Sequence, residues 1–270
     1  MKKKLLGLPY YLWCLIFILA PLCMVFYYGL TDKNGIFTFQ NVSAISSPEH
    51  LKALLLALVL SLIATFICLL LSYPLSMILC GMKKGQNSLM VFIFILPMWM
   101  NFLLRTLAWQ TLLEKTGVIN NILSFLHLPA LVIINTPYAI VLGMVYNFLP
   151  FMVLPIYNSL AKIDENVIQA ARDLGANSIQ VFLHITLPLS TPGIISGITM
   201  VFVPALTTFV ISKLLGGSKI LLIGNVIEEE FTQASNWHLG SGLSIVLMLF
   251  ILINMALSAL FDKEGEGSFL

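Results

Sequence analysis

Few side chains of this sequence are grouped in the way that catalysis requires. Neither H-E-x-x-H nor G-x-S-x-G occurs, so there is no metalloprotease or serine hydrolase signature. The run Gly216-Gly217-Ser218-Lys219 lacks the first glycine and the following Ser or Thr of a phosphate-binding loop. The sequence therefore predicts neither an enzyme nor a bound cofactor, and any ATP and Mg²⁺ must be used by a partner chain.

The cysteines predict no metal site either. They lie in or beside apolar runs, without a C-x-x-C motif or a nearby histidine: Cys14, Cys23, Cys68 and Cys80. We interpret them as small buried apolar side chains.

The segment at residues 162–186 carries the most specific pattern. Asp164 is predicted to cap the N-terminus of a helix, and Gly175 stands where a left-handed C-cap is expected. Asn177 followed by Gln180 predicts a second helix that begins with a capping box. We expect two short helices, sharply angled at Gly175 and parallel to the membrane surface. An ordinary amphipathic connector would share each feature taken singly.

This segment also matches the pattern E-A-A-x(3)-G-x(9)-I-x-L-P in order and spacing, through Gln169, Ala170, Ala171, Gly175, Ile185, Leu187 and Pro188. It resembles the EAA loop of the permeases of ATP-binding cassette (ABC) importers. The resemblance implies a cytoplasmic coupling loop whose helix sits in a cleft of a separate ATPase. Gln169 stands where the family has a glutamate. This keeps the geometry of the loop but removes the carboxylate.

Further segments look like the PotB-like permeases of spermidine/putrescine ABC importers. They are residues 96–99 (LPMW), 149–155 (LPFMVLP), 170–176 (AARDLGA), and 216–217 with 221–227 (GG and LLIGNVI). The segment ending in I-G-N-V-I favours polyamines over other cargo. By this resemblance the partners are a PotA-like ATPase dimer, a PotC-like second permease subunit and a PotD-like extracytoplasmic binding protein.

A polyamine pathway needs groups that replace water around an ammonium, such as carboxylates, carbonyls or aromatic rings. The long apolar stretches contain no Asp or Glu, so any carboxylate at membrane depth must come from the partner permease. Residues beside prolines are candidates for this pathway, although packing between helices is the commoner role for any one of them: Trp99, Asn101, Tyr146, Asn147 and Phe148.

Charged residues at the outer side suggest a second contact. Glu228, Glu229, Glu230 and Trp237 are candidates for docking of the binding protein or for concentrating polyamine, and a solvated charge run is the alternative. Arg105 lies inside an apolar stretch and would repel a polycation. We expect it to cap carbonyls or to pair with an acid of a partner chain.

The chain that positions all of these residues is strongly apolar. Apolar residues make up 59% and charged residues 10%, against about 45–50% and about 25% in soluble domains. The net charge of +2 is too small to indicate nucleic-acid binding. Six stretches can cross the roughly 30 Å of hydrocarbon in a bilayer: 5–30, 53–82, 89–113, 138–161, 187–211 and 242–261. We predict one all-α transmembrane permease domain over 1–270, and the resemblance implies the type I (MetI-like) importer architecture.

Positive charges in the short loops predict the orientation. A cytoplasmic N-terminus places Lys2, Lys3, Lys4, Lys83, Lys84, Lys162, Arg172 and Lys263 inside, and Lys33, Lys52, Lys115, Lys213 and Lys219 outside. This predicts a multi-pass protein of the bacterial cytoplasmic membrane with both termini in the cytoplasm. Two apolar segments, 118–128 and 220–227, are too short to span, and each is expected at the interface or in the mouth of the bundle.

Other functions stay open at this point. The same fold could carry sulfate, molybdate or iron instead of polyamines. An intramembrane enzyme would need a polar catalytic set at membrane depth, and His127, His184 and His238 all lie outside the spans. An ion channel is disfavoured because the sequence has no recognisable filter motif.

Overall fold

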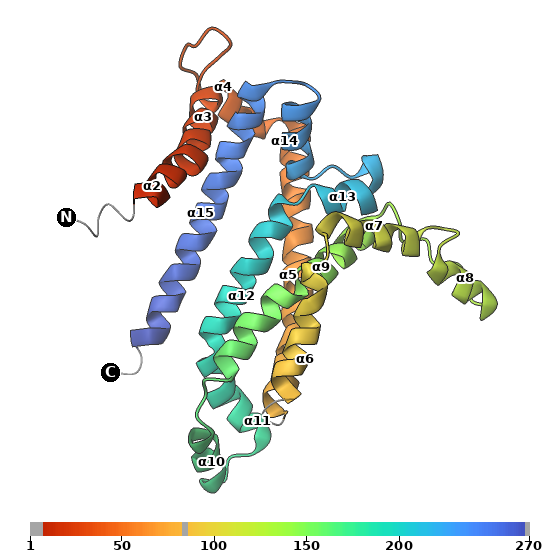
Figure 1. Ribbon diagram of the computed structural model, residues 1–270, viewed down its shortest axis with the longest axis vertical. Helices are drawn as coiled ribbons and strands as arrows, with labels where there is room; N and C mark the ends of the chain where they lie inside the picture. The colour runs from red at the N-terminus through yellow and green to blue at the C-terminus, as the bar shows by residue number, and fades with distance from the viewer. Residues whose placement is uncertain (1–7, 83–85, 268–270) are drawn as a thin grey trace.

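The computed structural model describes residues 8–82 and 86–267, and in these ranges the chain is helical apart from loops and one isolated bridge between Thr31 and Phe37. Five helices are long and apolar enough to cross a membrane, and a bent pair makes a sixth crossing if it counts as one span. This agrees with the six predicted spans (Figure 1). Lys2, Lys3, Lys4, Lys83 and Lys84, on which the predicted orientation partly rests, lie outside the described residues.

The first span consists of α2 (Leu8–Cys14), the π-helix η1 (Leu15–Leu19) and α3 (Ala20–Gly29). Two short helices, α4 (Gln40–Ser43) and η2 (Ala44–Ser46), lead into the second span, α5 (Pro48–Gly81). The fourth span is α9 (Pro137–Leu160), and the sixth is α15 (Trp237–Gly267). Proline at the first position opens both α5 and α9, where its missing N–H costs no hydrogen bond.

The third span is not the single helix expected over 89–113. It consists of α6 (Gln86–Ile95) and η3 (Leu96–Trp99), followed by α7 (Phe102–Leu113) and α8 (Val118–Phe125). The two halves of this bent pair, 89–99 and 102–125, meet at 88°. The side chain of Asn101 accepts hydrogen bonds from the backbone N–H groups of Leu103 and Leu104, so a new helix begins there instead of the old one continuing.

The fifth span differs from expectation at both ends. Residues 178–207 form one continuous helical run of α11 (Ser178–Val181), the π-helix η4 (Phe182–Thr186) and α12 (Leu187–Thr207). The prediction of a separate second surface helix after Gly175 is therefore wrong. The ring of Pro188 would clash with the carbonyl of His184, and the wider π turn gives that carbonyl room, so the helix passes through the proline.

The outer end of this span is shorter than predicted. Thr208 is extended, and α13 (Val210–Leu215), η5 (Gly217–Lys219) and α14 (Ile223–Thr232) come after it. Leu222 and Ile223 are fully buried, so the segment at 220–227 packs into the bundle. By contrast, Ile122 and Phe125 of α8 are exposed at 54% and 82%, which fits an interfacial helix better than one in the bundle mouth.

The core lies where α9 packs between α5 and α12. α5 and α9 run in the same direction, and three side chains of α5 donate to carbonyls of α9: Cys68 to Val145 (3.8 Å), Ser76 to Val153 (3.1 Å) and Cys80 to Tyr157 (3.6 Å). All three pairs are separated by 77 residues, so one register joins the two helices over most of their contact. Tyr73 and Ser190 share a buried hydrogen bond of 2.8 Å that ties α5 to α12.

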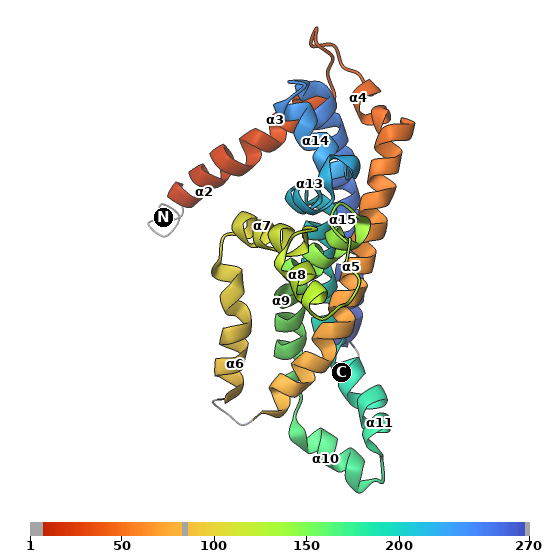
Figure 2. The same ribbon diagram turned by 90° about the vertical axis from the view of Figure 1, so that its right-hand side faces the viewer.

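The two ends of the bundle carry different elements. Figure 1 and Figure 2 place the connection from α9 to α12 at one end, together with the end of α5 and the start of α6. The hairpin between α3 and α4 lies at the opposite end with α14. The candidate coupling loop and the acidic residues of α14 are thus on opposite sides of the bundle, as the predicted topology requires.

Candidate coupling loop and transport site

The connection from α9 to α12 begins with the helix α10 (Glu165–Asp173), whose two ends are capped as predicted. Asp164 Oδ1 accepts from the N–H of Asn166 at 2.9 Å. At the other end Gly175 has φ +87°, its N–H donates to the carbonyl of Arg172, and the N–H of Ala176 donates to the carbonyl of Ala171. This pair of bonds is a Schellman C-cap, which needs a left-handed residue and therefore favours glycine. The capping box of Asn177 and Gln180 is also present.

Two large apolar side chains of this loop are exposed among polar neighbours. Leu174 is 89% exposed and Ile179 69%, and Gln169 and Ala170 are exposed beside them. Of the other residues in the motif, Ala171, Ile185 and Leu187 are half-buried and Pro188 is exposed. We expect these side chains to belong to an interaction surface, and this role stays a prediction.

Behind α10 there is a cavity of about 670 Å³, lined by the ends of α5 and α9 and by α10 and α11. Glu165 and Arg172 line it from α10, and Val181 and Phe182 from the start of the fifth span. α10 is therefore held by its two connections more than by packing on the spans.

Arg105 holds the bend of the third span. Its side chain is 7% exposed, its Nε donates to Asn147 Oδ1 at 2.7 Å, and its Nη1 donates to the carbonyl of Pro97 at 2.8 Å. Its guanidinium also lies 5.7 Å from the ring centroid of Tyr146. The expectation that Arg105 caps carbonyls is confirmed, and no Asp or Glu pairs with it among the described residues.

The predicted pathway residues fall into two groups. Trp99 is 76% exposed and packs edge-on against Phe92, and Asn101 is an exposed helix cap. Tyr146 is 38% exposed, whereas Asn147 and Phe148 are buried, with Phe148 stacked on Phe102 at 6.4 Å. The structure thus brings Tyr146 and Asn147 together around Arg105 and leaves Trp99 on an open surface, and a role of these residues in transport stays a prediction.

The candidates at the other end lie in α14 and at the start of α15. Glu228 forms an ion pair with Lys213 at 3.1 Å, while Glu229 and Glu230 are half-buried without such a partner among the described residues. Trp237 is 51% exposed and contacts Tyr28 and Phe231. Their role in docking also stays a prediction.

Asn225, in the motif that favoured polyamines, has a structural function that the sequence did not reveal. Its Oδ1 accepts from Ser212 Oγ and from the N–H of Leu222, and its Nδ2 donates to the carbonyl of Phe209 at 3.0 Å. These bonds join α13 to α14. Asn225 is 2% exposed, so the bonds hold the segment from α13 to α14 inside the bundle.

Almost the whole chain matches a known family of transport components. The model of the family described as "Binding-protein-dependent transport system inner membrane component" matches residues 5–264. The chain belongs to this family. It is 36% identical over 267 residues to "Spermidine/putrescine transport system permease protein PotB" of Haemophilus influenzae, covering 94% of this chain and 93% of that protein. The identity to the PotB of Escherichia coli K12 is also 36%, over 94% of this chain and 97% of that one.

Solved structures of the same kind of transport component share the fold. A bacterial ABC transporter involved in the import of the acidic polysaccharide alginate superposes with a TM-score of 0.82 at 19% identity, covering 97% of this chain and 95% of the other. The MetNI methionine ABC transporter gives a TM-score of 0.58 at 15% identity, covering 82% and 99%. These identities are low, so the likeness concerns the fold alone. It confirms the predicted all-α permease architecture, and family membership makes the chain a multi-pass membrane protein that serves in transport.

Proposed function

We propose that this chain is one of two permease subunits of an ATP-driven importer for the polyamines spermidine and putrescine. It forms half of the translocation pathway and binds no cofactor, because a separate ATPase uses the ATP and Mg²⁺. The observation that carries the proposal is the 36% identity to spermidine/putrescine permeases over 94% of the chain. The partners are a PotA-like ATPase dimer, a PotC-like second permease and a PotD-like binding protein.

The geometry of α10 supports the coupling part of this proposal. The capped helix α10 carries two small residues, Ala170 and Ala171, that allow close approach to a groove of the ATPase, and Leu174 and Ile179 that follow it are exposed. The cavity behind α10 leaves this helix room to follow movements of the ATPase.

Copurification followed by reconstitution tests the function. The chain is expressed with a PotC-like permease, a PotA-like ATPase and a PotD-like binding protein, and the complex is placed in proteoliposomes. We expect spermidine with the binding protein to stimulate ATP hydrolysis and to be taken up. Stimulation by sulfate, molybdate or iron without stimulation by either polyamine would contradict the proposed cargo but not the fold.

The proposed topology places both termini and α10 in the cytoplasm and α14 outside. A single cysteine at position 172 should react with a membrane-impermeant reagent only after permeabilisation, and one at position 229 should react in intact cells. Both variants are made in a chain without Cys14, Cys23, Cys68 and Cys80. Labelling of position 172 in intact cells would contradict the orientation and the coupling role.

Gly175→Leu should reduce uptake about tenfold, which corresponds to about 1.4 kcal/mol. A Cβ at position 175 meets no atom within 4 Å, so the variant suffers no clash and its effect comes from φ +87°. That conformation costs a residue with a side chain about 1–2 kcal/mol, and Asn tolerates it best.

Gly175→Asn is the matched control and should retain most of the uptake, as should Gln169→Glu, which restores the family motif. ATPase retained on the permease during purification reports the contact directly. Equal uptake by the Leu and Asn variants would exclude a role for the left-handed cap.

A further inference from the structure

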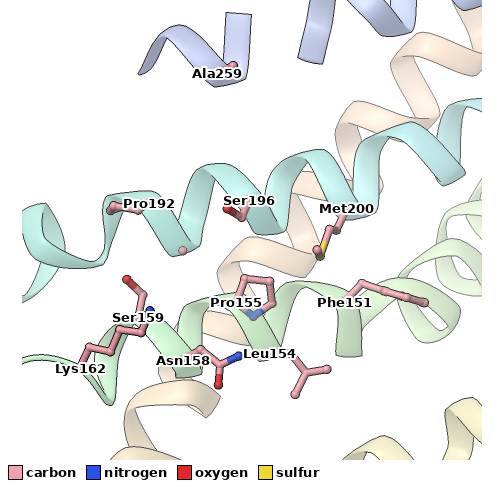
Figure 3. Close-up of a pocket in the computed structure, with 11 residues that line it drawn as sticks. Phe151, Leu154, Pro155, Asn158, Ser159, Lys162, Pro192, Ser196, Met200 and Ala259 are labelled. Atoms are coloured by element: carbon pink, nitrogen blue, oxygen red, sulfur yellow. The ribbon is translucent and has the colours of Figure 1, made fainter. Parts of the chain in front are cut away.

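A groove of about 800 Å³ runs between α9 and α12 on the side away from α5, and Ala259 of α15 borders it (Figure 3). Phe151 and Met200 lie at one end of it and Lys162 at the other, and Asn158, Ser159 and Ser196 lie between them. The volume is in the range of about 300–1,000 Å³ that small-molecule sites occupy. None of the pathway candidates named from the sequence lines this groove.

Two polar side chains of the groove have unused hydrogen-bonding capacity. The side chains of Asn158 and Ser196 form no hydrogen bond among the described residues, although Ser190, Thr191 and Thr199 of the same helix as Ser196, α12, all donate to backbone carbonyls. An amide or hydroxyl without a partner is costly in hydrocarbon. This face therefore does not turn toward lipid.

A proline frees a backbone acceptor on a residue that lines the groove. Pro155 has no N–H, so the carbonyl of Phe151 lacks the donor that the helix would otherwise supply four residues later. The ring of Phe151 and the thioether of Met200 border the groove as well. Apart from Lys162 the groove thus offers oxygen acceptors and polarisable groups, and an alkylammonium, which has only donors to offer, is the complementary ligand.

We propose that this groove binds the ammonium groups of the polyamine during its passage, with Asn158, Ser196 and the freed carbonyl of Phe151 as acceptors. The inference rests on the proposed function, because it takes the cargo to be a polyamine. A site without a carboxylate suits a cargo that must leave again, since a carboxylate would hold the polycation more strongly. Lys162, beside Ser159 in Figure 3, repels a polycation at that end of the groove and limits its residence there.

Protection of a thiol tests the groove in the assembled complex. Ser196→Cys, in a chain without the four native cysteines, is treated in membrane vesicles with 2-aminoethyl methanethiosulfonate, a small ammonium-bearing thiol reagent. We expect modification, slowed about tenfold by spermidine at about ten times its dissociation constant, because protection scales with 1 + [L]/Kd. Leu252→Cys, at an exposed apolar position of α15, is the control and should not react.

Two further variants sharpen the test. Asn158→Leu should reduce the protection of Ser196→Cys by spermidine, and Lys162→Gln should increase it. No modification of Ser196→Cys would mean that the partner permease fills the groove and would overturn the proposal. So would modification that spermidine does not slow while the unaltered complex takes up spermidine. Uptake by the unaltered complex is measured in the same vesicles, so failure of the proposed function is seen separately from failure of the groove.

Discussion

Arg105→Leu is expected to abolish most uptake while the amount of protein in the membrane stays the same or rises. The substitution leaves the Oδ1 of Asn147 without its donor and removes one of the two donors of the Pro97 carbonyl, which keeps the N–H of Met100. An unsatisfied buried acceptor costs about 1–3 kcal/mol, so the bend loses about that much, and a loss of only 1.4 kcal/mol is already tenfold. Leucine also removes the cost of placing an arginine in an apolar segment, so insertion itself does not suffer.

Uptake and the amount of permease in the membrane must be measured together, because the substitution is expected to lower the first without lowering the second. Arg105→Lys keeps the charge but cannot reproduce the planar fork that reaches Pro97 and Asn147 at once, so we expect only partial function. Leu104→Ala, at the adjacent position that is 61% exposed, is the control and should behave as the unaltered chain. Normal uptake by Arg105→Leu would show that the bend does not depend on this side chain.

Gly193→Ala should lower the yield of folded permease and of the assembled complex. A Cβ at position 193 would lie 2.6 Å from the carbonyl oxygen of Pro155 and 2.6 Å from Cβ of Ser159, so α9 and α12 must separate. One of the two contacts is backbone, which cannot rotate away, and overpacking of this kind costs about 1–3 kcal/mol.

Gly81→Ala is the matched control for this substitution. Gly81 also lies in a helix, but a Cβ there meets nothing within 4 Å. We expect Gly81→Ala to give the same yield as the unaltered chain when both are measured as monodisperse protein after extraction in detergent. An equal yield for Gly193→Ala would contradict the close contact between α9 and α12.

The coupling loop is predictable because its signals are local. The Asp164 cap, the Gly175 C-cap and the Asn177–Gln180 box each depend on residues within one helical turn, and all three are present. The prediction is wrong only for the next segment, where Pro188 suggests the start of the fifth span. A π turn lets the helix continue through that proline, and nothing in the local sequence distinguishes this from a helix start.

The bend of the third span depends on contacts that the sequence does not reveal. Pro97 indicates a kink, but the bond that holds the new direction joins Arg105 to Asn147, 42 residues away. Contacts between distant residues also decide where the pathway candidates lie. Asn147 and Phe148 have suitable chemistry beside a proline, yet both point into contacts with the third span. Which face of a helix is buried depends on the helices that pack against it. The residue pattern of a single helix does not contain this information.

The common register of α5 and α9 has a consequence for the transport cycle. Helices joined at three levels by bonds of equal sequence offset cannot slide or roll past each other without breaking all three. They should therefore move as one rigid body when access alternates between the two sides of the membrane. α6 is separated from them by a cavity of about 480 Å³, which gives it room to swing about the bend that Arg105 holds. Spin labels on α5 and α9 should keep their separation through ATP turnover, while labels on α6 and α9 change theirs.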